Sequence, residues 1–192
     1  MRNLFAVLPL AAIALFAAPQ AQAQLYAGGY GGLGIAHDGV ADNAGTPGIL
    51  TQDLGFGFGA FVGGYVRPNV RAEGEISYRT NNLESFSGVL VGGEVNTLSF
   101  MGNAYYDFTV HSAVQPYVGA GLGLAEIDMT GLSNGSDSVA AGQLMLGAAI
   151  GLSPDVDLLF EYRLFGTLDP NIGALTFENV HSGVLAGIRA KF

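Results

Sequence analysis

The sequence predicts an all-β protein: an eight-stranded antiparallel transmembrane β-barrel with short periplasmic turns and four longer extracellular loops. Three observations predict it. The composition is apolar and poor in charge, with 12% charged residues and 30 glycines in 192 positions. Apolar and polar residues alternate with a period of two over blocks of about ten residues, as in membrane strands that have one lipid-facing and one lumen-facing side. Short turns also alternate with long polar connections along the chain.

Composition excludes several other classes of protein. An average soluble domain carries roughly 25% charged residues, about twice the share found in this chain. The apolar content excludes disorder, and the irregular spacing of glycine excludes a collagen helix. The lack of cysteine excludes a disulfide scaffold and a thiolate metal site. An ordinary water-soluble enzyme is therefore disfavoured.

The first 23 residues are predicted to be a secretory signal peptide. Arg2 gives a positive start, an apolar run covers residues 4–18, and Ala21-Gln22-Ala23 has the small-residue pattern of a cleavage site. The apolar run is too short to span a membrane comfortably. We therefore expect residues 1–23 to be cleaved during export and residues 24–192 to form the barrel domain.

Without Arg2, the barrel domain has 6 basic and 16 acidic residues, a net charge of −10. Phosphate binding requires clusters of Lys and Arg, so nucleic acid is not an expected partner.

Alternation is clearest in four blocks of the chain, 53–66, 70–80, 96–109 and 156–167. In the first block, large apolar residues occupy one face, while the other face holds mostly glycine with Phe61 and Tyr65. In the second block, one face is polar at five successive positions, which are Arg71, Glu73, Glu75, Ser77 and Arg79. A soluble lipocalin-like barrel has an apolar interior, and it would place the glycine-rich face of the first block outside. The membrane barrel is the better interpretation.

The connections between the blocks differ in length. Short turns are predicted at Arg67-Pro68-Asn69, at His111-Ser112-Ala113 and at Ser153-Pro154-Asp155. Four long polar connections are predicted at 37–52, 81–93, 129–138 and 169–177. Each interval between short turns fits one strand, one long loop and a second strand, so four such units give eight strands. Both ends of the barrel domain then lie on the short-turn side, as in outer-membrane barrels.

Alternation also places charged residues in the lumen. Eight are expected there: Arg71, Glu73, Glu75, Arg79, Asp107, Glu161, Arg163 and Arg189. Four are basic and four are acidic, which predicts a network of internal ion pairs. The interior of an eight-stranded barrel is just wide enough to be filled by side chains. We therefore expect a structural plug with a polar core, and the alternative is a gate whose ion pairs exchange partners to admit small solutes. Inward glycines leave room for water unless tyrosines such as Tyr105 and Tyr117 fill it.

The outer face and the long loops have a different chemistry. Nine aromatic residues are expected against lipid: Phe56, Phe58, Tyr78, Phe100, Tyr106, Phe108, Phe160, Tyr162 and Phe192. Ten acidic residues are expected on the extracellular side: Asp38, Asp42, Asp53, Glu84, Glu94, Glu126, Asp128, Asp137, Asp169 and Glu178. They would repel anionic lipopolysaccharide unless divalent cations bridge the two. Solvated loop charges are the simpler interpretation, so no metal site and no cofactor is predicted.

No catalytic residue is predicted. His111-Ser112 and His181-Ser182 are adjacent pairs, and neighbouring side chains on a strand point to opposite faces. His37 lies in a loop, and the His-x-Ser spacing expected of lipid A deacylases is missing. We therefore expect no enzymatic activity.

Several segments resemble one superfamily, the eight-stranded outer-membrane protein A and opacity-protein barrels, often called porin-family outer-membrane proteins. The similar segments are 64–78, 103–107 and 116–123. The ending is similar to the family's C-terminal assembly signal, with Gly187, Ile188 and the terminal aromatic Phe192. Ala190 departs from the aromatic that often lies two positions before the end. The resemblance implies recognition by the barrel-insertion machinery and a place in the outer membrane of a Gram-negative bacterium.

The resemblance and the residue pattern together predict a monomeric, non-enzymatic barrel. Its expected role is envelope integrity and surface interaction through acidic extracellular loops. Its expected partners are outer-membrane lipids, lipopolysaccharide and an extracellular ligand or host surface. A narrow channel for small solutes is the alternative, and a lipid-modifying enzyme is the third hypothesis.

Overall fold

The computed structural model describes residues 24–37, 39–43, 46–52, 54–86, 89–90, 92–110, 112–131, 134–172, 175–177 and 179–192. The predicted signal peptide, residues 1–23, lies outside the described residues, as do the acidic residues Asp38, Asp53 and Glu178. Within the described part of the chain, no helix is long and apolar enough to cross a membrane.

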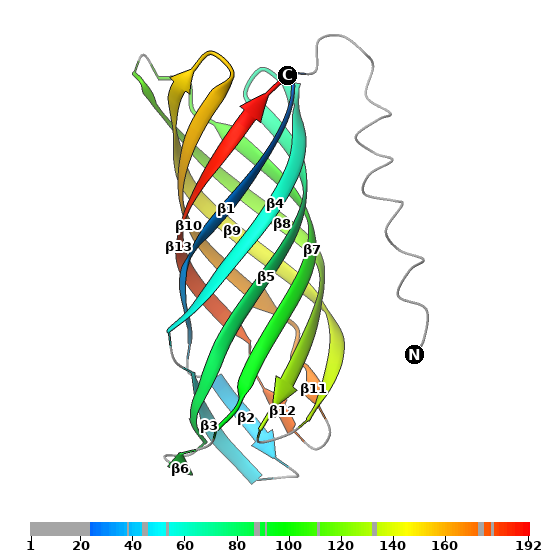
Figure 1. The fold of residues 1–192 in the computed structure, drawn as a ribbon. Coiled ribbons are helices and arrows are strands. Elements are labelled where there is room, and N and C mark those ends of the chain that lie inside the picture. Colours follow the sequence, from blue (N-terminus) through cyan, green and yellow to red (C-terminus); the bar gives the residue numbers. More distant parts are fainter. Residues whose placement is uncertain are drawn as a thin grey trace.

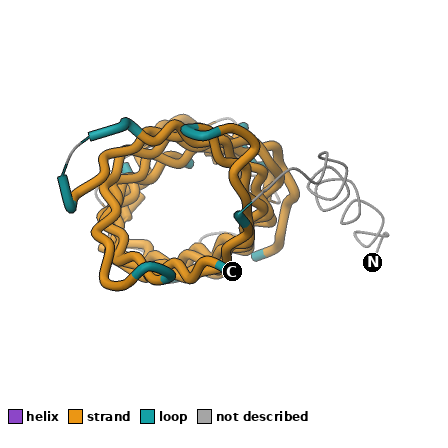
Figure 2. Tube along the Cα trace, turned by 90° about the horizontal axis from the view of Figure 1, so that it is seen from above, coloured by secondary structure: helices purple, strands orange, loops and turns teal. Residues whose placement is uncertain are grey.

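Eight long antiparallel strands close into a barrel (Figures 1 and 2). In order around the wall they are β1 (Leu25–Ala36), β4 (Leu54–Arg67), β5 (Val70–Phe86), β7 (Glu94–Asp107), β8 (Val114–Thr130), β9 (Gly135–Ser153), β10 (Val156–Thr167) and β13 (Val180–Lys191). The last strand returns to the first, with Tyr26 opposite Lys191 and Ala36 opposite His181. Closure leaves no open sheet edge in the wall. The predicted eight-stranded antiparallel barrel is confirmed.

One end of the barrel, which we call the short-turn end, carries three short connections (top of Figure 1). Turns at Pro68–Asn69 and Pro154–Asp155 join β4 to β5 and β9 to β10, and residues 108–113 join β7 to β8. The first strand begins and the last strand ends at this same end, because the backbone N–H of Phe192 donates to the carbonyl of Leu25 at 2.9 Å. The predicted turns at residues 67–69 and 153–155 are confirmed, and the third short connection lies between β7 and β8 as predicted, although its His111 is outside the described residues.

The opposite end, the long-loop end, carries a second, smaller sheet. Its short strands are β2 (Gly39–Asn43), β3 (Thr46–Gln52), β6 (Val89–Leu90), β11 (Asn171–Ile172) and β12 (Leu175–Phe177). They pair in the order β11-β12-β2-β3, and β3 and β6 each pair with the end of β5. Three of the predicted long loops therefore contain strands. Polar composition alone did not reveal this, because strands that extend beyond the membrane need no apolar face.

The prediction of a third long loop at residues 129–138 is wrong. The ladder between β8 and β9 continues to the pair Met129–Gly135, so only residues 131–134 connect the two strands. Gly131 has a φ of 109°, a conformation that glycine adopts readily and L side chains rarely do. The serines at 136 and 138 are exposed on the outward face, so their polarity is compatible with a strand.

The outer face of the wall is apolar and uncovered. Large apolar side chains project from it on every long strand, and among the most exposed are Leu33, Leu54, Leu122, Leu144, Leu146 and Val184. Of the nine aromatic residues predicted on this face, seven are exposed, while Tyr78 and Phe100 are half-buried. We call this continuous apolar outer surface the apolar belt, and a surface of this kind is stable only against lipid. The alternation predicted from the sequence is therefore confirmed on both faces, and the soluble lipocalin-like alternative is excluded.

A charge at the middle of this belt is expected to destabilise the barrel. Leu144, on the outward face of β9, is 59% exposed, and replacing it by arginine should cost about 2–4 kcal/mol if it lies at the bilayer midplane. Leu168, 68% exposed just beyond β10 at the long-loop end, is the matched control, and Leu168→Arg should cost roughly 0–1 kcal/mol. Denaturant unfolding in lipid vesicles measures both. Equal costs would contradict a membrane-embedded belt.

Candidate functional site

The lumen holds the polar and charged groups that the sequence predicted. The backbone of β5 is extended, so its odd-numbered residues point inward: Arg71, Glu73, Glu75, Ser77 and Arg79. The first four are buried and Arg79 is half-buried. Asp107 on β7, Glu161 and Arg163 on β10, and Arg189 on β13 are buried as well. All eight predicted residues thus lie inside the barrel, and all but Arg79 belong to one of three clusters.

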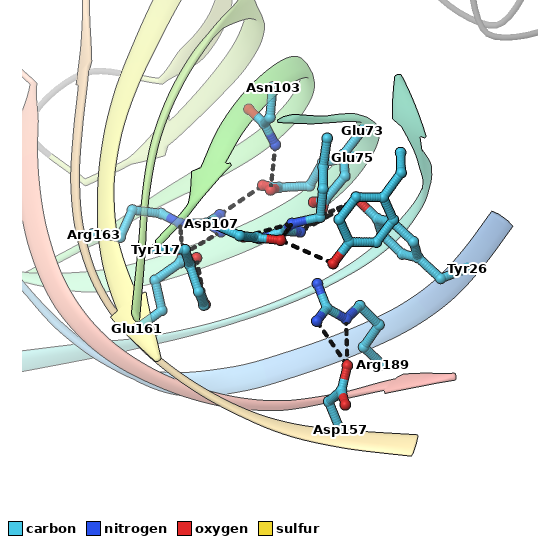
Figure 3. Close-up of polar contacts among 12 residues, drawn as sticks. Tyr26, Glu73, Glu75, Asn103, Asp107, Tyr117, Asp157, Glu161, Arg163 and Arg189 are labelled. Atoms are coloured by element: carbon cyan, nitrogen blue, oxygen red, sulfur yellow. Dashed lines mark hydrogen bonds and ion pairs between the residues drawn. The ribbon is translucent and has the colours of Figure 1, made fainter. Parts of the chain in front are cut away.

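The first cluster surrounds Arg71, and its members Tyr26, Glu73 and Asp107 are labelled in Figure 3. Its Nε lies 3.0 Å from both carboxylate oxygens of Asp107, and its Nη1 donates to Glu73. The hydroxyl of Tyr26 donates to Glu73 at 2.8 Å, and that of Tyr65 donates to Asp107 at 2.9 Å. One guanidinium is therefore shared by two carboxylates, and each carboxylate also accepts a tyrosine hydroxyl. We call these five residues the Arg71 cluster.

The second cluster surrounds Arg163 on β10. Its Nη1 donates to Glu75 at 2.7 Å, and its Nη2 donates to Glu161 at 2.6 Å. Glu75 also accepts hydrogen bonds from Tyr30 at 2.7 Å and Asn103 at 3.0 Å. The Arg163 cluster, made of these five residues, joins β1, β5, β7 and β10 across the lumen (Figure 3).

The third cluster includes two residues that sequence reasoning missed. Asp157 on β10 bridges Arg189 at 2.7 Å and Lys191 at 2.9 Å, both on β13. Asp157 lies four residues before Glu161 and so shares its face of β10. The period-two alternation could therefore have placed Asp157 in the lumen.

Arg79 forms no direct ion pair with a described residue, so its part in the predicted ion-pair network stays a prediction. Among the described residues its contacts are a hydrogen bond from Nη1 to Ser99 Oγ at 3.0 Å and the ring of Phe165, whose centroid lies 4.0 Å from the guanidinium carbon. The nearest carboxylate along its inward row is Glu75, and Arg163 occupies that carboxylate. Equal numbers of acidic and basic residues did not reveal that Arg79 lacks a direct ion pair, because pairing depends on the position of each side chain along the barrel axis.

The interior is less polar than predicted. Aromatic and aliphatic side chains fill the space between the ionic clusters, in one group around Tyr105 and Tyr117 and another around Phe165. Inward glycines lie directly opposite large side chains, as Gly119 does opposite Tyr105 and Gly59 opposite Tyr30. A Cβ on Gly119 would lie 2.5 Å from Cδ1 of Tyr105. The tyrosines therefore occupy the room that the glycines leave.

The side chains of His181 and Ser182 separate as the alternation predicted, while His111 of the other predicted pair lies outside the described residues. His181 points into the lumen, where its Nε2 lies 2.6 Å from Oδ1 of Asn179. Ser182 points outward, and its Oγ lies 3.0 Å from Nε2 of His37, a contact across 145 positions that sequence reasoning missed. No carboxylate among the described residues contacts His37 to complete a catalytic triad. Within the same described ranges, no three His, Cys, Asp or Glu side chains gather as metal ligands would.

Comparison with known proteins identifies the family. The family described as the outer membrane protein beta-barrel domain matches residues 8–186. The chain belongs to the outer membrane protein β-barrel family. In such barrels the short turns lie in the periplasm and the longer loops outside the cell. A search of curated proteins finds no match.

Solved structures of outer-membrane barrels share this fold. Neisserial surface protein A is 25% identical, with a TM-score of 0.55 over 88% of this chain and 97% of that one. OprG from Pseudomonas aeruginosa is 14% identical, with a TM-score of 0.50 over 88% and 95%. The outer membrane protease OmpT from Escherichia coli is 8% identical, with a TM-score of 0.53 over 88% and 97%. The last two likenesses concern the fold alone, so a protease among them assigns no activity to this chain.

The three residues of the predicted assembly signal lie on or beside β13. Ile188 is 54% and Phe192 is 73% exposed on the outer face. Gly187 points inward against Tyr30, where a Cβ would lie 2.8 Å from the tyrosine's Cβ. Their role in assembly stays a prediction.

Proposed function

We propose that this outer-membrane barrel is a non-enzymatic, monomeric protein that supports envelope integrity and contacts other molecules through its long-loop end. The observation that carries the proposal is the filled lumen. Three ionic clusters and two apolar groups of side chains occupy the interior. A barrel closed in this way is suited to a structural role rather than to transport.

Two small cavities beside the ionic clusters are compatible with a closed barrel. One beside Arg79 has a volume of about 40 Å³, and another between the Arg71 and Arg163 clusters has about 20 Å³. A water molecule requires roughly 10–15 Å³ on this scale, so these spaces admit only a few waters. Conduction of hydrated solutes would require buried ion pairs to separate, and each separated charge would be costly to leave unpaired.

The long-loop end supports the surface role. Its second sheet extends the barrel beyond the apolar belt (bottom of Figure 1), and Glu94, Asp128 and Asp169 are exposed there. The likeness to Neisserial surface protein A is consistent with a role at the cell surface. The proposed partners are outer-membrane lipids, lipopolysaccharide and an extracellular ligand or host surface.

Planar bilayer recordings test the closed lumen directly. The refolded barrel domain is expected to give no reproducible conductance steps, because side chains occupy the path. Arg163→Ala, which removes the centre of one cluster, should raise conductance above that of the unaltered barrel, and Arg67→Ala at the exposed turn is the control. Steady ion-selective channels from the unaltered protein would favour the narrow channel instead.

The surface role requires a separate experiment in cells. Cells lacking the protein should be more sensitive to detergent and bile salts, and the unaltered chain should restore resistance. A chain whose β2–β3 hairpin, residues 39–52, is replaced by a short turn should restore envelope resistance but lose binding to the partner surface. If this variant behaves like the unaltered chain in both assays, the proposed surface role of the long-loop end is wrong.

A further inference from the structure

Ser182 and His37 form a hydrogen-bonded pair on the outer face of the barrel, where β1 and β13 lie side by side (Figure 1). Ser182 points outward from β13, and its Oγ lies 3.0 Å from Nε2 of His37. His37 directly follows β1, and its backbone N–H donates to the carbonyl of Val180 at 2.8 Å, which fixes its position. A serine hydroxyl within hydrogen-bond reach of an imidazole is the arrangement of a nucleophile and its base.

The pair lies at the edge of the apolar belt nearest the long-loop end. In the strand register, Ser182 is opposite Ile35 on one side and Leu164 on the other. Ile35 is 55% exposed, and Leu54, the next residue along the same row, is 58% exposed. Strand β1 ends and β4 begins at this level, so the apolar belt gives way here to the polar long-loop end. The ester bonds of lipids lie at such a boundary, where the hydrocarbon core meets the headgroups.

We propose that Ser182 is an acyl-acceptor site, which becomes esterified by a fatty acyl group from an ester-linked lipid of the surrounding leaflet. Oγ attacks the ester carbonyl carbon, and the bond from that carbon to the alcohol oxygen of the lipid breaks. The tautomer of His37 with its proton on Nδ1 takes the serine proton at Nε2. His37 then passes this proton to the departing alcohol oxygen, so the products are acyl-Ser182 and the deacylated lipid.

The surface beside Ser182 suits an attached fatty chain. The outward face of β13 continues toward the short-turn end with Val184 and Ile188, which are 64% and 54% exposed. A chain joined to Ser182 would lie along this face and keep water from the new ester. The reaction modifies the barrel once and turns over no substrate, so it is independent of the proposed non-enzymatic envelope role.

Refolding the barrel domain into phosphatidylcholine vesicles with heptadecanoyl chains tests the transfer, because the unusual chain length marks its source. Intact-mass spectrometry should show one added heptadecanoyl group, and peptide mapping should place it on Ser182. Ser182→Ala should gain none. His37→Gln should react about 100-fold more slowly, the lower end of the roughly 10²–10⁴-fold that a positioned base contributes. Ser138→Ala, at an exposed outward serine near the long-loop end of β9, is the matched control and should react like the unaltered barrel.

Two further vesicle compositions identify the donor. An ether-linked phosphatidylcholine of the same chain length has no ester bond and should leave the barrel unmodified. Vesicles that also contain lipopolysaccharide distinguish the two lipid sources, because its acyl chains differ in mass from heptadecanoyl.

Either of two results would overturn the proposal. One is an unaltered barrel that gains no acyl group in ester-linked vesicles. The other is a His37→Gln barrel that reacts as fast as the unaltered one, since the pair would then be only a structural contact. Both variants remove a single exposed hydrogen bond, so they are expected to fold, and heat-modifiable migration on gels checks that they do.

Discussion

Replacing Arg163 by methionine is expected to destabilise the barrel by about 3–5 kcal/mol, the usual cost of removing one partner from a buried ion pair. The substitution leaves Glu75 and Glu161 buried without their shared cation. It also removes the hydrogen bond of 2.6 Å to the hydroxyl of Tyr30. Denaturant unfolding of the barrel in lipid vesicles measures the free energy of unfolding.

Two further variants separate lost charge balance from lost packing. Arg67→Met, at the exposed turn, should change the free energy of unfolding by less than about 0.5 kcal/mol, as surface substitutions usually do. The triple variant Arg163→Met, Glu75→Gln, Glu161→Gln should recover part of the lost stability, because no carboxylate then remains uncompensated. If the triple variant is less stable than Arg163→Met alone, the ion pairs are not the source of the effect.

Replacing Gly119 by alanine is expected to cost about 1–3 kcal/mol, the usual cost of overpacking a filled interior. The new Cβ would lie 2.5 Å from Tyr105 and 3.0 Å from Cε of Met145. Gly74→Ala is the matched control: Gly74 is a strand glycine on the outward face, where a Cβ would have no atom within 4 Å. That change should be neutral or stabilise by up to about 1 kcal/mol, since alanine restricts the unfolded chain.

A double-mutant cycle then tests the contact itself. If Tyr105 occupies the space over Gly119, alanine at 119 should cost much less in a Tyr105→Leu background. Additive effects of the two substitutions would show that Tyr105 and Gly119 are independent, and that tyrosines do not fill the lumen by packing over glycines.

Much of the barrel follows from local pattern. Period-two alternation fixes which face of each strand is apolar, as in the row from Arg71 to Arg79 on β5. Proline turns at residues 68 and 154 mark two of the strand ends. The connection between β8 and β9 was predicted poorly, because serine and glycine occur both in loops and in strands that project into water.

The pairing of charges could not be predicted in the same way. Arg163 meets Glu75 across 88 positions in the sequence, and His37 meets Ser182 across 145. Such contacts depend on the stagger between strands, which sets the height of each inward residue. The same stagger leaves Arg79 without a direct ion pair among the described residues, although the predicted charges balance in number.

The sequence by itself determined the closed eight-stranded wall, its apolar exterior and its charged interior, because alternation and turn spacing are local properties of the chain. Only the tertiary structure decided which ions pair, that tyrosines fill the space over glycines, and that a second sheet extends the barrel at the long-loop end. The physical reason is that these contacts form only when the barrel wall is closed. Residues from β1, β5, β7, β10 and β13 meet inside the lumen only after the last strand has paired with the first.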